Sequence, residues 1–159
     1  MRIAAISLLA LLLFATQGYS QNLLNQRIRK ISSKKQSVYF DNGIFHNGNS
    51  KVSAMVKSLR HSFSSSKGYE RVVFDFKGKK LPRLYGHVSK IDRKIYLDLF
   101  STNLPSSIDS FGNTKFVKAV NFFPITKESL SVEILLKDSA GADIFYLESP
   151  ARLVIDLKK

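Results

Sequence analysis

Two arginine and aspartate pairs with the same spacing are the residues of this chain best suited to chemistry. Arg71 and Asp75 stand four positions apart in ERVVFDF, and Arg152 and Asp156 stand four positions apart in RLVIDL. A guanidinium is a planar fork of donors that matches a carboxylate, whereas an aspartate only accepts hydrogen bonds. On a β-strand, residues four apart are separated by about 13 Å. Each side chain therefore needs a partner on another strand or on a ligand.

The spacing leaves two interpretations of these charges open. If the strands around 71–76 and 94–99 are antiparallel neighbours, Arg71 faces Asp98 and Lys94 faces Asp75. Such cross-strand pairs would fix the strand register and have no further role. Alternatively, the charges form an outer polar face for a ligand that carries carboxylates, amides and hydroxyls.

Catalytic motifs are missing from the sequence. His46, His61 and His87 are scattered, without the H-E-x-x-H spacing of a zinc hydrolase, and the chain has no cysteine. It also lacks a G-x-S-x-G nucleophile motif and a glycine-rich phosphate loop. We therefore expect no catalytic residue, no metal ion, no cofactor and no enzyme activity. Paired carboxylates for glycoside cleavage stay an open alternative, because their separation depends on the tertiary structure.

The first residues have the pattern of a secretory signal peptide. Arg2 precedes an apolar run over 3–15, and Gly18 and Ser20 are the small residues that a signal peptidase requires. The run is too short to cross the roughly 30 Å hydrocarbon core of a bilayer. We expect residues 1–20 to be removed and the protein to reach the periplasm or the cell exterior; an uncleaved anchor is the alternative.

Positive charge is concentrated after this signal. The chain has a formal net charge of +13, and residues 21–67 contain nine Lys or Arg and a single acidic residue, Asp41. We expect residues 21–50 to be a basic arm, mostly flexible, that contacts anionic surfaces. Asn42-Gly43, which lies between short aromatic and β-branched runs, predicts a hairpin within this arm.

Residues 51–159 have the period-two alternation of β-strands, with turn residues between the apolar runs. The strands are predicted over 56–63, 70–77, 83–89, 94–100, 115–123, 129–137, 142–148 and 151–157. Their sequences form two sets of four that resemble each other, such as VKSLRHSF with VKAVNFFP and KIYLDL with RLVIDL. We therefore predict an all-β fold, a β-sandwich of two similar four-stranded sheets from an internal duplication, with each repeat forming one sheet.

The alternation also sorts the side chains of each strand into two faces. The inward, core-forming sets are predicted to be Val72, Phe74 and Phe76; Ile95, Leu97 and Leu99; and Leu153, Ile155 and Leu157. The charged residues of the same strands then point outward.

At these residues the sequence resembles the AMIN domain family, the module found at the N-terminus of bacterial cell-wall amidases and in type IV pilus secretins. The resemblance covers about 52–159 and is carried by VKSLRHSF leading into YERVVFDF and by FYLESPARLVIDL. It implies a non-catalytic sandwich that binds peptidoglycan and localises its owner in the cell envelope. By motif position, binding would involve Arg71 and Asp75 in one sheet, Arg152 and Asp156 in the other, and Arg60. SVEILLK departs from the motif, because Ser131 and Leu135 stand where arginine and aspartate are expected.

The resemblance also implies partners. We expect peptidoglycan as the ligand and envelope proteins, such as an amidase or secretin complex, as further partners. Alternative functions are a protein-interaction scaffold or a polyanion-binding module of an envelope or pilus assembly. Nucleic acid is not expected, although the sequence pI of about 10.0 and the Lys, Arg, Tyr and Phe alternation near 82–100 would suit it.

Overall fold

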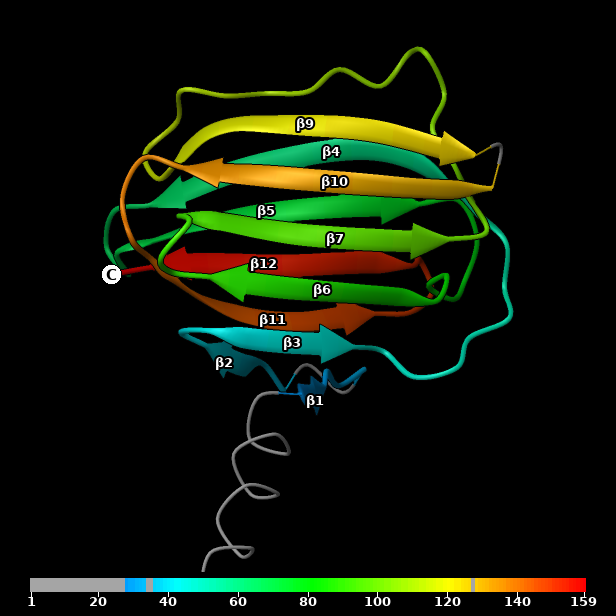
Figure 1. Ribbon diagram of the computed structural model, residues 1–159, viewed down its shortest axis with the longest axis horizontal. Helices are drawn as coiled ribbons and strands as arrows, with labels where there is room; N and C mark the ends of the chain where they lie inside the picture. Colours follow the sequence, from blue (N-terminus) through cyan, green and yellow to red (C-terminus); the bar gives the residue numbers. More distant parts are fainter. Residues whose placement is uncertain (1–27, 34–35, 127) are drawn as a thin grey trace, which may run out of the picture.

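The computed structural model describes residues 28–33, 36–126 and 128–159, and these residues form β-strands and no helix. The predicted signal peptide, residues 1–20, lies outside the described residues. The strands, drawn in Figure 1, are β1 (Ile28–Lys30), β2 (Val38–Phe40), β3 (Gly43–His46), β4 (Ala54–Ser64), β5 (Tyr69–Phe76), β6 (Leu84–Ser89), β7 (Lys94–Phe100), β8 (Thr102–Asn103), β9 (Val117–Thr126), β10 (Ser129–Leu136), β11 (Gly141–Leu147) and β12 (Arg152–Lys158). All eight strands predicted after residue 51 are confirmed, with ends shifted by three residues at most.

The strands form two six-stranded sheets that lie one behind the other in Figure 1. The sheet in front, sheet A, has the order β1-β3-β6-β7-β10-β9, and the sheet behind it, sheet B, has the order β2-β11-β12-β5-β4-β8. The predicted all-β fold is therefore confirmed, but the sheets have six strands each and not four.

One apolar core fills the space between the sheets. The predicted inward side chains of β5, β7 and β12 are all buried, each with 1% of its surface exposed at most. Alternate residues of a strand point to opposite faces, so these strands cover the core on one side and direct their charged residues, together with Val73 and Val154, to the other. Burial of these apolar side chains is the main driving force for pairing the two sheets.

The two repeats are distributed differently from the prediction. Each sheet takes two strands from each repeat: sheet A contains β6 and β7 from the first and β9 and β10 from the second, and sheet B contains the remaining pairs. Within the repeats, β4 and β5, β6 and β7, β9 and β10, and β11 and β12 form hairpins. Residues 77–83 and 137–140 cross from one sheet to the other between these hairpins. The repeats are interleaved, so that β5 of the first repeat pairs with β12 of the second. Both sheets are thereby tied together by chain crossings as well as by the core.

Residues 28–46, where the sequence predicts a flexible arm, extend both sheets. β1 and β3 join sheet A, whereas β2 joins sheet B. Ile31, Phe40 and Phe45 are buried in the common core, and their burial offsets the entropy lost when the segment becomes ordered. The described part of the basic segment therefore belongs to the sandwich.

The hairpin predicted at Asn42-Gly43 is wrong. The chain does turn there, and Gly43 has a φ of 137°, which glycine adopts without strain. However, β2 pairs with β11 and β3 pairs with β6, so the turn leads from one sheet to the other. The Asn42-Gly43 dipeptide indicates a turn. The pairing of β2 and β3 depends instead on which strands lie beside them in the folded protein.

Candidate functional site

All five candidate binding residues lie on the outer face of sheet B. Arg60 lies on β4, Arg71 and Asp75 lie on β5, and Arg152 and Asp156 lie on β12, and these three strands are neighbours. The sequence predicted the two arginine and aspartate pairs in different sheets, and the structure corrects this. The reason is the interleaving of the repeats, which makes β5 and β12 adjacent.

The repeated R-x-x-x-D spacing makes the two strands reciprocal. In the antiparallel β5–β12 pair, Arg71 is opposite Asp156 and Arg152 is opposite Asp75. Both strands have an arginine four residues before an aspartate. Because the strands are antiparallel, the arginine of each strand lies opposite the aspartate of the other strand. The repeated spacing thus fits one register of β5 against β12, as well as placing the charged side chains on the outer face.

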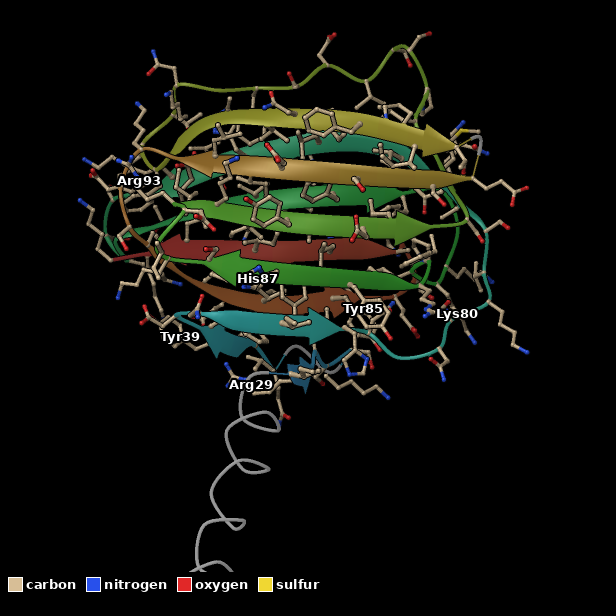
Figure 2. All side chains as sticks on the ribbon, viewed as in Figure 1. Arg29, Tyr39, Lys80, Tyr85, His87 and Arg93 are labelled. Carbon is tan, nitrogen blue, oxygen red and sulfur yellow. The ribbon has the colours of Figure 1, made fainter. Side chains whose placement is uncertain are left out.

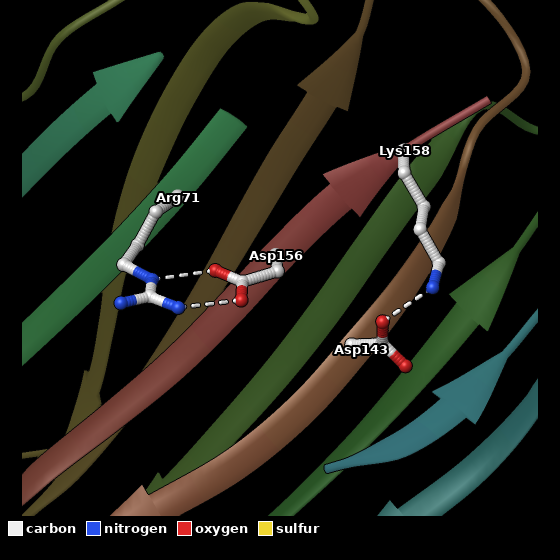
Figure 3. Close-up of polar contacts among 4 residues, drawn as sticks. All are labelled: Arg71, Asp143, Asp156 and Lys158. Carbon is white, nitrogen blue, oxygen red and sulfur yellow. Dashed lines mark hydrogen bonds and ion pairs between the residues drawn. The ribbon is translucent and has the colours of Figure 1, made fainter. Parts of the chain in front are cut away.

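Arg71 and Asp156 form a bidentate ion pair (Figure 3). The Arg71 Nε and one terminal nitrogen donate to the two carboxylate oxygens of Asp156, each at 2.7 Å. The hydrogen bond to Asp156 raises the pKa of Arg71. The guanidinium also lies 5.3 Å from the ring centre of Tyr69 and 5.8 Å from that of Phe145. Paired on one side and flanked by rings on the other, Arg71 is held in one orientation.

Asp75 is paired with a residue of β4 and not with its register partner. Arg60 donates two hydrogen bonds to its carboxylate, at 2.6 and 2.8 Å, and Ser58 donates a third at 2.7 Å. Burial alone would raise the pKa of Asp75, but the hydrogen bonds from Arg60 and Ser58 outweigh it. With a smaller contribution from the charge of Arg152, the pKa of Asp75 is lowered, and the carboxylate is held ionised.

The cross-strand pairs that the sequence suggested, Arg71 with Asp98 and Lys94 with Asp75, are wrong. β7, which carries Lys94 and Asp98, belongs to the other sheet. There, Lys94 lies 3.6 Å from Glu133, and Asp98 accepts a hydrogen bond of 2.5 Å from Ser131. The general idea of cross-strand pairing holds, but the partners are on different strands.

A β-bulge in β4 gives Arg60 its outward direction. Val56 is opposite Phe76 and Ser58 is opposite Asp75, so Lys57 is an extra residue in β4. Because one added residue exchanges the two faces of a strand, Val56 is buried in the core while Ser58 and Arg60 both point outward. The second repeat has the same irregularity in β9, where Lys118 falls between the partners of Leu135 and Leu136.

Arg152 is the guanidinium without a hydrogen-bonded partner in this group. It stands opposite Asp75 in the register, but Arg60 and Ser58 occupy that carboxylate. The Nε of Arg152 is buried and has no hydrogen bond within the described part of the chain. A buried donor without an acceptor costs free energy, so the Arg152 guanidinium, unlike those of Arg60 and Arg71, is not satisfied within the described residues.

A hollow of about 330 Å³ lies over these residues. Its lining combines three guanidinium groups with apolar side chains, namely Arg60, Arg71, Arg152, Val73, Val154, Phe145 and Leu147. Val73 and Val154 form its floor, because they are outward residues of β5 and β12 and are nevertheless buried. Ser58, Phe145 and Leu147 were not predicted from the sequence, because they lie on strands without the R-x-x-x-D motif.

The outer face of sheet A has a different chemistry at the equivalent positions. Lys94, Tyr96 and Asp98 of β7 correspond to Arg152, Val154 and Asp156 of β12, and Ser131 takes the place of Arg71. A hollow of about 360 Å³ on this face is lined by Ile44, Tyr85, Gly86, His87, Tyr96, Asp98 and Phe100. Figure 2 shows Tyr85 and His87 on β6 of this sheet. The guanidinium cluster is therefore specific to sheet B.

Within 28–33, 36–126 and 128–159, no three His, Asp or Glu side chains are grouped so that they could hold a metal ion. The same residues contain no helix of the length and apolarity needed to cross a membrane. No model of a known protein family matches the chain, and no curated protein sequence matches it.

Proposed function

We propose that this protein is a non-catalytic module that binds peptidoglycan in the bacterial cell envelope through the outer face of sheet B. One observation supports this most strongly: the three arginines implied by the AMIN resemblance line a single hollow together with apolar side chains, and the two implied aspartates pair with Arg60 and Arg71 beside it. Peptidoglycan offers carboxylates, amides and hydroxyls on amphipathic sugar and peptide units. A rigid arginine fork beside apolar side chains suits such a ligand.

The internal symmetry supports the same family assignment. We infer that the domain arose by duplication of a four-strand unit, because β4, β5, β12 and β11 follow one another in sheet B as β9, β10, β7 and β6 do in sheet A. The matching bulges in β4 and β9 strengthen this inference.

The remaining charge suggests a second, less specific contact. Residues 21–67 contain most of the excess of Lys and Arg, and we propose that they attract anionic polymers or lipid headgroups of the envelope. Such attraction depends on counterion release and is weakened by salt, whereas a paired and partly buried site is screened much less.

A salt series tests the proposed function. The purified protein is incubated with insoluble peptidoglycan sacculi, or with immobilised polyphosphate, at NaCl concentrations up to about 0.5 M, where the Debye length is only about 4 Å. We expect polyphosphate binding to disappear over this range and sacculus retention to persist. If retention on sacculi fell in parallel with polyphosphate binding, the interaction would be a general attraction between charges, and the proposed function would be refuted.

A further inference from the structure

We propose that the hollow on sheet B takes a monoanionic carboxylate next to a small apolar group, and that Arg152 is the residue that binds it. This inference rests on the proposed function and specifies which chemical feature of the wall the site recognises. Arg60 and Arg71 then have a different role: they shape and position the site.

The three arginines differ in the hydrogen bonds that remain for a ligand. Arg71 is committed to Asp156 by two bonds, and Arg60 is committed to Asp75 by two bonds. The Arg152 side chain makes no hydrogen bond within the described residues. Its buried Nε is closed to a ligand, whereas the terminal nitrogens, at the end of a side chain that lines the hollow, can donate to a carboxylate there.

The charge of the site favours a single negative charge on the ligand. Three guanidinium groups and two carboxylates, Asp75 and Asp156, leave one positive charge that is not neutralised. A monoanion would balance it. A phosphate dianion would bring an extra negative charge close to two aspartates, and like charges at short distance disfavour binding.

The floor of the hollow indicates what accompanies the carboxylate. Val73, Val154, Phe145 and Leu147 line the hollow beside the guanidinium groups. A methyl or similarly small apolar group lying on these side chains would remove apolar surface from water, worth about 0.8 kcal/mol for each methylene-sized group. The site thus suits a carboxylate that has a small apolar group beside it.

Peptidoglycan presents this chemistry in two places. One is the lactyl group of muramic acid after its stem peptide has been removed, and the other is a terminal D-alanine of a stem peptide. Both have a methyl group and a carboxylate on the same carbon atom. Binding of soluble fragments distinguishes the two sources.

The experiment compares each acid with a close analogue that lacks the carboxylate. N-acetylmuramic acid is paired with N-acetylglucosamine, and N-acetyl-D-alanyl-D-alanine is paired with its C-terminal amide. Dissociation constants are measured by NMR titration of the ¹⁵N-labelled protein. We expect one acid to bind at least tenfold more tightly than its analogue and to shift the amide signals of β12 and β11.

Variants assign the effect to Arg152. We expect Arg152→Ala to weaken binding of the acid at least tenfold and Arg152→Lys, which keeps the charge but loses the planar fork, to give an intermediate loss. Lys94→Ala, at the equivalent position of sheet A, is the matched control and should leave binding unchanged. Arg152→Lys also serves as the test if Arg152→Ala does not fold.

The results separate this inference from the proposed function. If neither acid binds better than its analogue, or if both Arg152 variants bind like the wild type, the inference is overturned, while salt-resistant retention on sacculi would still support wall binding. If an acid binds through Arg152 but sacculi are not retained, the carboxylate site stands and the proposed function fails.

Discussion

At the scale of single residues, the arginines on the outer face of sheet B have two different environments. Arg60 and Arg71 form ion pairs, whereas the Arg152 side chain has no hydrogen bond among the described residues. Arg71 is paired with Asp156, whose side chain is 13% exposed, whereas Arg152 has no hydrogen bond in the described structure. Removing the partner of the buried Asp156 carboxylate leaves that group unsatisfied, whereas removing an unpaired donor leaves no acceptor unsatisfied. The two arginines of the repeated motif should therefore respond differently to the same substitution.

Arg71→Ala should lower the free energy of unfolding by about 1 to 3 kcal/mol, because it leaves the Asp156 carboxylate without its two donors. Arg152→Ala should change it by less than about 1 kcal/mol. Urea unfolding followed by circular dichroism measures both. An Arg152→Ala variant that is destabilised as much as Arg71→Ala would mean that Arg152 has a structural partner.

Asp75 should contribute to stability in a pH-dependent way. Its pKa is lowered in the folded protein, so between that value and the unfolded value of about 3.9 the unfolded chain binds more protons, and stability rises with pH. The contribution is complete above the unfolded pKa and is lost as the pH falls through the folded pKa. We expect Asp75→Asn to be clearly less stable than the wild type at pH 6, with a smaller difference at pH 3. A difference that stayed constant between the two pH values would contradict the lowered pKa.

At the scale of elements, the pairing of β5 with β12 is the feature that creates the site. The sequence predicted both strands and both faces, since period-two alternation is a local property. It did not predict their pairing, because the register between residues 85 positions apart depends on which edges meet in the folded state. Period-two alternation also did not predict that Arg60 points outward, because this direction depends on the bulge at Lys57, which interrupts the alternation.

A charge exchange tests this pairing. Arg71→Asp and Asp156→Arg should each be destabilising, and the double variant should recover about 1 to 3 kcal/mol relative to the sum of the single effects. The combination of Arg71→Asp with Asp98→Arg, which tests the register suggested by the sequence, should show no recovery. Recovery in the second pair and not in the first would place β5 beside β7 and refute the interleaved topology.

At the scale of the whole molecule, the sandwich is larger than the sequence suggested. Strands β1 to β3, from the segment expected to be a flexible arm, extend both sheets and bury three large side chains. The aromatic ring of Phe45 occupies the space beside Gly86, where a Cβ atom would lie 2.1 Å from the ring. The short apolar runs between the basic residues did not predict that this segment joins the sheets. Their burial depends on a partner surface that only the folded domain provides.

Phe45→Ala and Phe40→Ala should each lower the free energy of unfolding by about 3 to 5 kcal/mol, because each removes a fully buried ring from the common core. Chemical denaturation of the full chain measures the effect, and Tyr39→Ala, an exposed neighbour, is the control. Losses below about 1 kcal/mol for both phenylalanines would mean that residues 28–46 do not stabilise the sandwich.

We propose that sheet B, and not sheet A, binds the wall, and that it does so through Arg152, whose neighbours Arg60 and Arg71 are held in ion pairs. Arg152→Ala and Lys94→Ala each remove one positive charge at equivalent positions of the two sheets. The decisive measurement is the fraction of each variant retained on peptidoglycan sacculi at about 0.5 M NaCl, where long-range attraction is screened. We predict that Lys94→Ala is retained like the wild type and that Arg152→Ala is mostly lost. Equal retention of the two variants would mean that Arg152 is not the residue that binds the wall.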